Sequence, residues 1–357
     1  MSHYLVTGGA GFIGSHLSEA LLAQGQQVTV IDNLSTGRFD NIAHLTDHPS
    51  FHFAIDTITN EVVMDRLVSE CDRVVHLAAA VGVELIIKDP VHVIETNILG
   101  TRAVLNVASR YRKKVLLAST SEIYGKSERV PFGEDDDRVI GSSTKARWSY
   151  STSKAVDEFL GLAYHRQVGL PVVVFRLFNT IGPRQTGRYG MVVPRFVSQA
   201  LAGESLTVYG DGSQTRCFLH VGDAVEAIIT LAESSQAVGE VFNVGSTDEI
   251  SILALARKIL TMVDAVCPDQ IQGARRSYAG KGGQQERIAL VPYEEAYETG
   301  FEDMLRRVPD TTKIQRLVGW RQRRTLDETL KDVIRSLSAE PARPLPDDGS
   351  GAFGEQG

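Results

Sequence analysis

The stretch HYLVTGGAGFIGSHLSEALLAQG, residues 3–25, decides the fold of this chain. Its apolar start is short enough for a β-strand, and its second half has the apolar spacing of a helix. Between them, Gly8, Gly11 and Gly14 form a G-x-x-G-x-x-G turn. Such a turn lets the backbone approach a pyrophosphate, and the helix N-terminus supplies free N–H groups and the positive end of a dipole. The stretch therefore predicts a dinucleotide site at the first strand of an α/β sheet.

The alternation of strand and helix continues through the first half of the chain. Further apolar strands are expected at residues 26–32, 51–55, 71–80 and 113–120, and a helical pattern runs from Asn97 to Tyr111. Short apolar strands separated by helices are typical of a parallel sheet with helices on both faces. We therefore expect an α/β protein with a doubly wound parallel (Rossmann) sheet and a smaller C-terminal substrate-binding α/β lobe.

The alternation of strand and helix ends after LPVVVFRLFNTIGP, residues 170–183, where loops rich in glycine and proline separate shorter elements. The expected boundaries are 1–178 for the cofactor domain and 179–337 mainly for the substrate lobe, with some later segments returning to the first domain. Residues 270–287 are polar and rich in Gly and Gln, which predicts a mobile loop. Residues 338–357 are rich in proline, glycine and acids, which predicts a disordered tail.

The composition narrows the class of protein. The 357 residues are 43% hydrophobic and 23% charged, and the formal net charge is −7, which suits a soluble protein and gives no sign of nucleic-acid binding. No apolar run is long enough to span a membrane, and a strand that begins by His3 leaves no room for a signal peptide. The three cysteines are scattered and fit neither a disulfide framework nor a zinc site. We expect a cytoplasmic protein without a metal.

Asp32 ends the second expected strand, 18 residues after Gly14. A carboxylate there accepts hydrogen bonds from a ribose 2′-hydroxyl and repels a 2′-phosphate, so NAD is expected rather than NADP. Asp56, after the third strand, is expected near the adenine, and the small residues of HLAAAVG (76–82) let a flat dinucleotide lie against the backbone. His76 is expected to be structural. The alternative is that the glycines only pack a helix on a strand.

Tyr150 and Lys154 lie four residues apart in WSYSTSKAVDEFL, residues 148–160, and so share one face of a helix. A lysine ammonium favours the phenolate and lowers the pKa of the tyrosine. Such a tyrosine can take a proton from a substrate hydroxyl as hydride leaves the adjacent carbon. Lys154 could also hold the nicotinamide ribose. The alternative is a surface Tyr–Lys pair.

The motifs together resemble one family. They are TGGAGFIGSHL, DNLSTG, HLAA, Thr96-Asn97, ASTSEIYG, YSTSK, RLFNTIGPRQ, LTVYGDGSQTRCFLHVGD, FNVGS and RRVPD. Over about residues 3–335, the chain is similar to the extended short-chain dehydrogenase/reductases, the NAD-dependent nucleotide-sugar epimerase/dehydratase group. The resemblance implies a nucleotide-diphosphate sugar (UDP, GDP or dTDP) as substrate, and a homodimer formed through the helix carrying Tyr150 and the helix from Asn97 to Tyr111.

The resemblance also implies the residues of the site. The expected catalytic residues are Thr120, Tyr150 and Lys154, with Glu122 for the second step. The expected cofactor contacts are Gly8, Gly11, Phe12, Ile13, Gly14, Asp32, Asn33, Ser35, Thr36, Gly37, Asp56, Leu77, Ala78, Ala79, Asn97, Tyr150 and Lys154. The expected substrate contacts are Val81, Ser121, Asn179, Val192, Val193, Thr207, Tyr209, Arg216 and Arg307. Among these, Arg216 and Arg307 would clamp the diphosphate, since guanidinium forks suit its oxygens; the alternative is surface salt bridges.

Glu122, in LLASTSEIYG (116–125), decides between the reactions of this group. In all of them Tyr150 takes a proton from a sugar hydroxyl, usually at C4, and a 4-keto intermediate forms. An epimerase needs no further base, whereas a dehydratase needs a carboxylate to remove the C5 proton, and a decarboxylase loses carbon dioxide from C5. By the resemblance, glutamate at this position is usual in the dehydratases and decarboxylases and less so in the simple 4-epimerases, so Glu122 favours elimination-type chemistry, although it could also merely orient a substrate hydroxyl or a loop.

Other segments favour different answers. Ser121 stands where some dehydratases have an aspartate, and RYGMVVPRF (188–196) resembles chains grouped with 4-epimerases. RWSYSTSKAVDEF (147–159) does not look like the corresponding stretch of the decarboxylases. We therefore expect a dehydratase or a 4-epimerase, with a UDP-glucuronate-type decarboxylase third. A non-catalytic NAD-binding regulator is the alternative from another class, disfavoured because Thr120, Tyr150 and Lys154 are intact.

Overall fold

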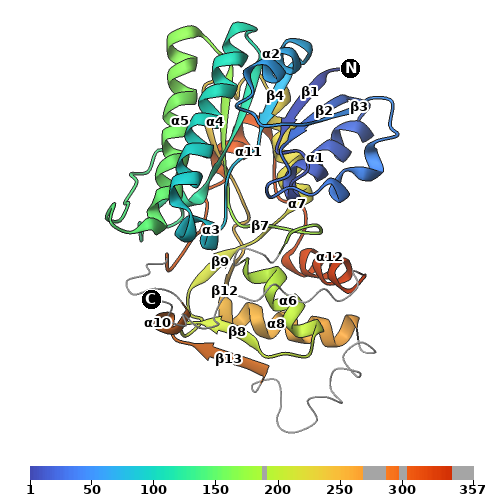
Figure 1. Cartoon of the computed structure of the whole chain (residues 1–357). Helices are drawn as coiled ribbons and strands as arrows, with labels where there is room; N and C mark the ends of the chain where they lie inside the picture. The colour runs from blue at the N-terminus through green and yellow to red at the C-terminus, as the bar shows by residue number, and fades with distance from the viewer. Residues whose placement is uncertain (187–190, 268–286, 297–303, 340–357) are drawn as a thin grey trace, which may run out of the picture.

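The computed structural model describes residues 1–186, 191–267, 287–296 and 304–339. Its centre is a sheet of seven parallel strands in the order β11-β6-β5-β4-β1-β2-β3 (Figure 1). The strands are β1 (His3–Thr7), β2 (Gln27–Asp32), β3 (Phe51–Ile55), β4 (Arg73–His76), β5 (Lys114–Thr120), β6 (Val172–Leu177) and β11 (Val241–Val244). The predicted doubly wound parallel sheet is confirmed.

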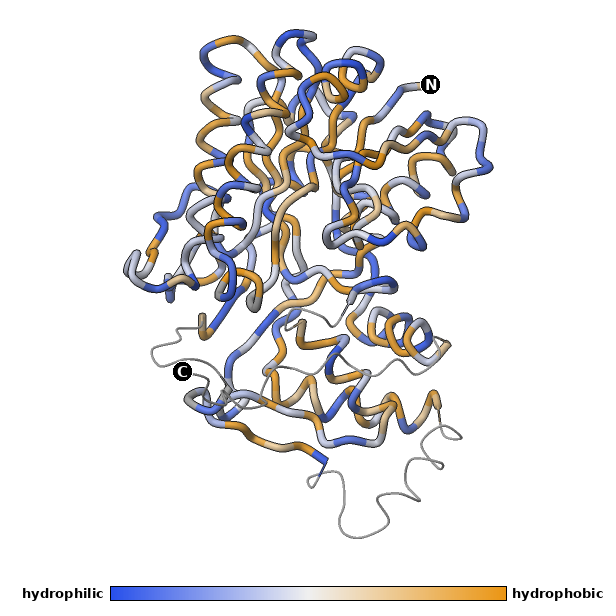
Figure 2. Tube along the Cα trace, in the orientation of Figure 1, coloured by the Kyte–Doolittle hydropathy of each residue, from blue (hydrophilic) through white to orange (hydrophobic). Residues whose placement is uncertain are grey.

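Alternate residues of each strand face opposite layers of helices. On one face, Tyr4 and Val6 of β1 belong to the core that includes α1 (Phe12–Ala23) and α7 (Val221–Glu233). On the other face, Leu5 packs in a second core. That core includes α2 (Glu61–Glu70), α4 (Pro90–Arg110) and α5 (Ser149–Val168). Figure 2 shows the hydrophobic residues along the strands between these layers. Burial on both faces explains why the strands read as continuous apolar runs.

The helix predicted from Asn97 begins seven residues earlier, at Pro90. The side chain of Asp89 caps it, because its carboxylate accepts a hydrogen bond from the His92 N–H at 3.2 Å. Proline is favoured in the first turn, where its missing N–H costs nothing. The Asp-Pro pair was therefore a helix-start signal that the sequence prediction did not use.

The second lobe is built from small pieces. Its core joins α6 (Val192–Leu201), α8 (Ile252–Val266) and α12 (Leu326–Ala339). Three two-stranded sheets accompany these helices: β7 (Thr180–Ile181) with β10 (Leu219–His220), β9 (Thr215–Cys217) with β12 (Glu249–Ser251), and β8 (Leu206–Tyr209) with β13 (Ile288–Val291). Because α7 and β11 return to the large domain, the chain crosses between the lobes several times. The division near residue 178 remains a prediction. The predicted tail (338–357) and mobile loop (270–287) lie almost wholly outside the described residues.

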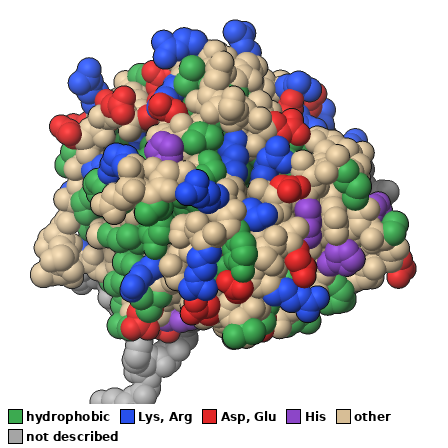
Figure 3. Space-filling model, turned by 90° about the horizontal axis from the view of Figure 1, so that it is seen from above, with side chains coloured by type: hydrophobic (Ala, Val, Ile, Leu, Met, Phe, Trp, Pro, Cys, Tyr) green, Lys and Arg blue, Asp and Glu red, His purple; other side chains and the backbone are tan. Residues whose placement is uncertain are grey.

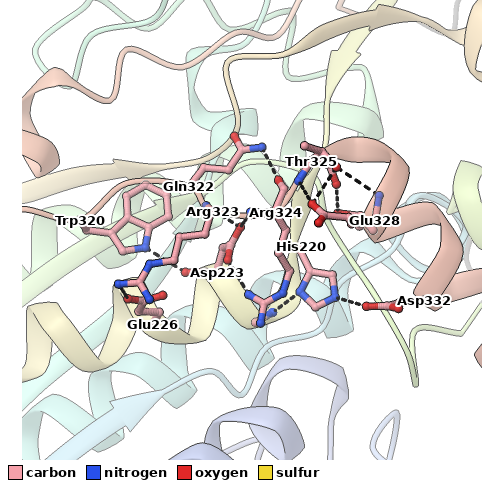
Figure 4. A network of polar contacts seen from close by, with 12 residues as sticks. His220, Asp223, Glu226, Trp320, Gln322, Arg323, Arg324, Thr325, Glu328 and Asp332 are labelled. Carbon is pink, nitrogen blue, oxygen red and sulfur yellow. Dashed lines mark hydrogen bonds and ion pairs between the residues drawn. The ribbon is translucent and has the colours of Figure 1, made fainter.

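A polar network fixes α12 and the turn before it against α7 (Figure 4). Fully buried Asp223 accepts hydrogen bonds from the backbone N–H groups of Arg323 and Arg324 and from the Arg324 guanidinium. Thr325 and Glu328 form a capping box at the start of α12. The second lobe is thereby tied to a helix of the cofactor domain. Among the described residues, no helix is long and apolar enough to cross a membrane.

Candidate active site

A cavity of about 850 Å³ lies where β1, β4, β5 and β6 end, and residues of both lobes line it. In parallel α/β sheets, the carboxyl ends of the strands are where ligands bind. All but two of the predicted site residues line this cavity. From the cofactor and catalytic predictions these are Gly8, Gly11, Phe12, Ile13, Gly14, Asp32, Asn33, Ser35, Thr36, Gly37, Asp56, Leu77, Ala78, Ala79, Thr120, Glu122, Tyr150 and Lys154. From the substrate predictions they are Val81, Ser121, Asn179, Val192, Val193, Tyr209, Arg216 and Arg307.

The glycine turn is shaped to receive a pyrophosphate. Gly8 has a φ of +70°, and a Cβ on Gly14 would lie 2.3 Å from the carbonyl oxygen of Gly8. Helix α1 begins next to this turn without a side-chain cap and without an acidic residue in its first turn. Its first N–H groups and its dipole therefore face the cavity without a competing anion of the protein.

Asp32 is held by the loop that follows β2. Its two carboxylate oxygens accept hydrogen bonds from Ala10 N–H at 3.0 Å and Leu34 N–H at 2.8 Å. A Cβ on Gly37 would lie only 2.8 Å from both oxygens, so the loop closes tightly around the carboxylate. Burial raises the pKa of Asp32, and the backbone hydrogen bonds oppose this. These residues fit an adenosine ribose and leave little room for a 2′-phosphate.

Two predicted contact residues lie outside the cavity lining. Asn97 is buried, and its amide binds the backbone of Ala80 and donates to Ser153 Oγ at 3.1 Å. It therefore fixes the segment after β4 against α5. The Thr207 hydroxyl accepts a hydrogen bond from Gln199 at 3.0 Å, which ties β8 to α6. Asn97 and Thr207 therefore hold segments of the cavity wall in place and do not line the cavity themselves.

Tyr150 and Lys154 lie on the same face of α5, as their spacing predicted, and both are buried. The predicted effect of one on the other is wrong in this structure. Burial raises the pKa of Tyr150, the charges of Glu122 and Asp157 raise it further, and a hydrogen bond with Thr120 only partly opposes this. Lys154 Nζ donates to Asp157 Oδ2 at 2.7 Å, so an acid that itself raises the pKa of Tyr150 lies beside the ammonium group.

Glu122 lies in a short 3-10 turn, Ser121–Tyr124, directly after β5. Its carboxylate is 2.5 Å from Arg147 Nη1 and 3.8 Å from Arg307 Nη1. Burial acts to raise the pKa of Glu122, but the charges of Arg147 and Arg307, the Arg147 hydrogen bond and the charge of Arg216 outweigh it and hold the pKa below its usual range. Glu122 is therefore a fixed negative charge among guanidinium groups.

Arg147 is the main site residue that the sequence prediction missed. It precedes Tyr150 by three residues, in the short turn Ala146–Trp148 that leads into α5, and its side chain is 6% exposed. The nearness of an arginine to Tyr150 could have suggested it. Its pairing with Glu122, 25 residues earlier, could be seen only in the folded chain. Arg195, in the segment 191–196 that the resemblance places near the nucleotide base, also lines the cavity and lies over the ring of Tyr209, 4.2 Å from the centroid.

A dinucleotide cradle that opens onto a buried tyrosine and lysine and a half-buried threonine is the arrangement of the extended short-chain dehydrogenase/reductases. The family model described as GDP-mannose 4,6 dehydratase matches residues 5–333, and the chain belongs to this family. The predicted family and fold are thereby confirmed. The chain is an NAD-dependent enzyme of this family.

Known proteins support this assignment. The chain is 42% identical to a UDP-N-acetyl-alpha-D-glucosaminuronate decarboxylase of Bacillus cytotoxicus, covering 93% of this chain and 96% of that one. It is 37% identical to UDP-glucuronic acid decarboxylase 1 of Danio rerio, covering 94% and 72% of the two chains. A crystal structure of dTDP-glucose 4,6-dehydratase from Bacillus anthracis in complex with NAD is 27% identical, with a TM-score of 0.78 and coverage of 95% and 97%. Decarboxylases, placed third from the sequence, are thus prominent among the relatives.

Proposed function

We propose that this enzyme is an NAD-dependent decarboxylase of a UDP-sugar that carries a carboxylate at C6. The observation that carries the proposal is the position of Glu122, held between Arg147 and Arg307 beside Tyr150 inside the cavity. The substrates that fit are UDP-N-acetylglucosaminuronate and UDP-glucuronate. Decarboxylases that act on these compounds are 42% and 37% identical to the chain.

The charges around Glu122 disfavour dehydration. A dehydratase needs a carboxylate that removes the C5 proton, and a good base has a pKa near the working pH. The guanidinium groups of Arg147 and Arg307 hold the pKa of Glu122 low instead. Glu122 is always ionised at neutral pH, but it is a weak base. Decarboxylation removes no proton from C5, so it does not need the base that this environment weakens.

The same charges favour a substrate carboxylate. Glu122 and a bound C6 carboxylate together carry two negative charges, which the Arg147 and Arg307 guanidinium groups can balance. Arg216 adds a third guanidinium group to the cavity lining. Its Nη1 donates a hydrogen bond to the carbonyl of Met304 at 2.8 Å. We assign Arg216 to the diphosphate and Arg147 to the carboxylate, with Arg307 beside the sugar. A 4-epimerase that acts on a neutral sugar has no use for this cluster.

The reaction balances with these residues. Tyr150 in its phenolate form accepts the proton of the C4 hydroxyl as the hydride on C4 leaves to NAD, and the product is a β-keto acid. The C5–C6 bond then breaks, carbon dioxide leaves, and the electron pair remains as the C4–C5 enolate, which cationic side chains stabilise. The enolate takes a proton at C5 from solvent, so the overall reaction consumes one proton for each carbon dioxide released. Finally the hydride returns to C4 and Tyr150 returns its proton to the oxygen, which gives a UDP-pentose.

Product analysis tests this proposal. The purified enzyme with NAD is incubated separately with UDP-N-acetylglucosaminuronate, UDP-glucuronate, UDP-glucose, dTDP-glucose and GDP-mannose, and the products are analysed by mass spectrometry and NMR. Loss of carbon dioxide from a uronate is expected. Loss of water from a neutral hexose would show a dehydratase, and an unchanged mass with a new NMR spectrum would show a 4-epimerase. Either of these, without decarboxylation, would overturn the proposal.

A pair of arginine variants sharpens the test. Arg147→Gln is expected to raise the KM for the uronate and slow carbon dioxide release, because it removes the charge that faces the carboxylate. Arg66→Gln is the matched control, since Arg66 is 78% exposed and lies on α2, outside the cavity. Uronate turnover by Arg147→Gln equal to that of the control would refute the carboxylate role of Arg147.

We also propose that the enzyme is a homodimer through α4 and α5. Phe159 on α5 is 64% exposed, and Ile94 on α4 is 38% exposed. Figure 3 shows hydrophobic side chains gathered on the side where Figure 1 places these helices. Light scattering is expected to give a dimer mass for the wild-type chain and a monomer mass for Phe159→Glu. A wild-type monomer would exclude this interface.

A further inference from the structure

We infer that Asp157 is a positioning residue for the first, oxidative step: with Thr101 and His76, it forms a buried chain that holds Lys154 and offsets its charge beside Tyr150. The inference rests on the proposed role of Tyr150 as proton acceptor. It does not depend on which reaction follows, because decarboxylation, dehydration and epimerisation share that first step.

The geometry begins at the pair of Lys154 and Asp157. Lys154 Nζ lies 2.7 Å from Asp157 Oδ2, and the two side chains are 4% and 0% exposed. The other carboxylate oxygen, Oδ1, is buried without a hydrogen bond of normal geometry. The Thr101 hydroxyl, on α4, lies close enough to stabilise the charged form of this carboxylate. Asp157 therefore has one strong partner, and that partner is the catalytic lysine.

The hydrogen bonds continue from Thr101 to the part of the cavity wall formed by the segment after β4. Thr101 Oγ1 is 3.1 Å from His76 Nε2, and His76 Nδ1 is 2.8 Å from Thr7 Oγ1. The Thr7 hydroxyl accepts a hydrogen bond from the N–H of Ala78, which lines the cavity, so its own proton is available to His76 Nδ1. In the tautomer with the proton on Nε2, neutral His76 accepts from Thr7 and donates to Thr101. In that tautomer the donors point from Thr7, beside the cavity, toward Asp157.

The groups that face Tyr150 show what this arrangement does. Thr120 approaches from β5, Glu122 from the turn after it, Arg147 from the turn before α5, and Asp157 from α5 itself; burial, Glu122 and Asp157 all raise the pKa of Tyr150. Asp157 is faced in turn by Lys154, Thr101 and Glu158. Removing the Asp157 charge removes one of the charges that keep Tyr150 protonated. The positive charge of Lys154 is then no longer offset.

The test is the pH dependence of hydride transfer, read as NADH absorbance in a single turnover of the holoenzyme with the UDP-sugar that the product analysis identifies. Asp157→Asn keeps the shape of the side chain and is expected to shift the acid limb of the profile toward lower pH. Thr101→Val, which withdraws support from the charged carboxylate, is expected to shift it in the same direction by less. Asp47→Asn, at an exposed position before β3, is the control and is expected to superimpose on the wild type.

The outcomes are separable. An acid limb of Asp157→Asn that superimposes on the wild type, or moves to higher pH, would overturn the inference, because a packing role predicts no shift. Folded protein with no NADH at any pH would overturn it too, since Asp157 would then do more than set a pKa. If Asp157→Asn does not fold, Thr101→Val decides by the same criterion. Failure of the proposed decarboxylation would instead appear in the product, with NADH formation intact.

Discussion

Two buried ion pairs flank Tyr150, and they differ in the number of positive charges around the carboxylate. Glu122 and Arg147 are 2.5 Å apart on one side, and Asp157 and Lys154 are 2.7 Å apart on the other. Burial acts to raise the pKa of both acids. The three arginines near Glu122 reverse this and lower its pKa, whereas one lysine near Asp157 does not, so the pKa of Asp157 stays raised.

The comparison shows that the same kind of pair can serve two purposes. Glu122 is a permanent anion that keeps Arg147 and Arg307 at the wall of the cavity. Asp157 offsets a single cation, and burial raises its pKa. The surroundings, and not the pair itself, decide how firmly each carboxylate keeps its charge. The predictions that follow change Tyr150 first, then Glu122 of the pair with more cations, and then His76, which lies near the pair of Asp157 and Lys154.

The largest effect is expected for Tyr150→Phe. This change leaves both ion pairs in place and removes the hydroxyl that accepts the substrate proton. Proton transfer by a positioned side chain is worth about 10²–10⁴-fold in rate. We expect hydride transfer to fall by that factor, measured as NADH formed in a single turnover, with an unchanged melting temperature. Hydride transfer at the wild-type rate would refute Tyr150 as the base.

Glu122→Gln is expected to have the next largest effect, on stability. It leaves the buried Arg147, 6% exposed, without its nearest negative charge, and breaking a buried pair in this way costs about 3–5 kcal/mol. Because Glu122 borders the cavity, we expect the lower end of that range in the free energy of unfolding, measured with urea. Wild-type stability in this variant would show that solvent screens the pair.

The same variant has a pH signature. The pKa of Glu122 is lower in the folded state than its ordinary value of 4.5. The pair therefore stabilises the fold above that value, and its contribution is lost as the pH falls through the folded pKa. The gap between wild type and Glu122→Gln should close under acid conditions. Full turnover of the substrate by Glu122→Gln would separately show that Glu122 is no catalytic base.

The sequence predicted what depends on local spacing. The glycine turn lies between a strand and a helix because the apolar pattern changes period there, and Tyr150 and Lys154 share a face because α5 is regular. It could not predict the ion pairs that set their chemistry. Arg147 meets Glu122 only when β5 and α5 pack together. Asp157 lies three residues after Lys154, a spacing that makes helix side chains neighbours, but the burial that makes this pair matter for Tyr150 appears only in the folded chain. For the same reason the direction of the Tyr150 pKa shift was wrong.

The smallest effect is expected from His76→Gln, on the pH dependence of stability. This variant probes the side of Tyr150 where Lys154 is the single cation. Burial and then the charge of Lys154 lower the pKa of His76 from 6.5 to about 3. Between these values the unfolded chain binds a proton that the folded chain does not, so wild-type stability falls with falling pH by about 1.4 kcal/mol per pH unit from this group. Glutamine does not titrate, so urea unfolding at several pH values should give a flatter curve for the variant between pH 6.5 and about 3. Parallel curves would mean that His76 accepts a proton in the fold, which a buried site next to Lys154 should not allow.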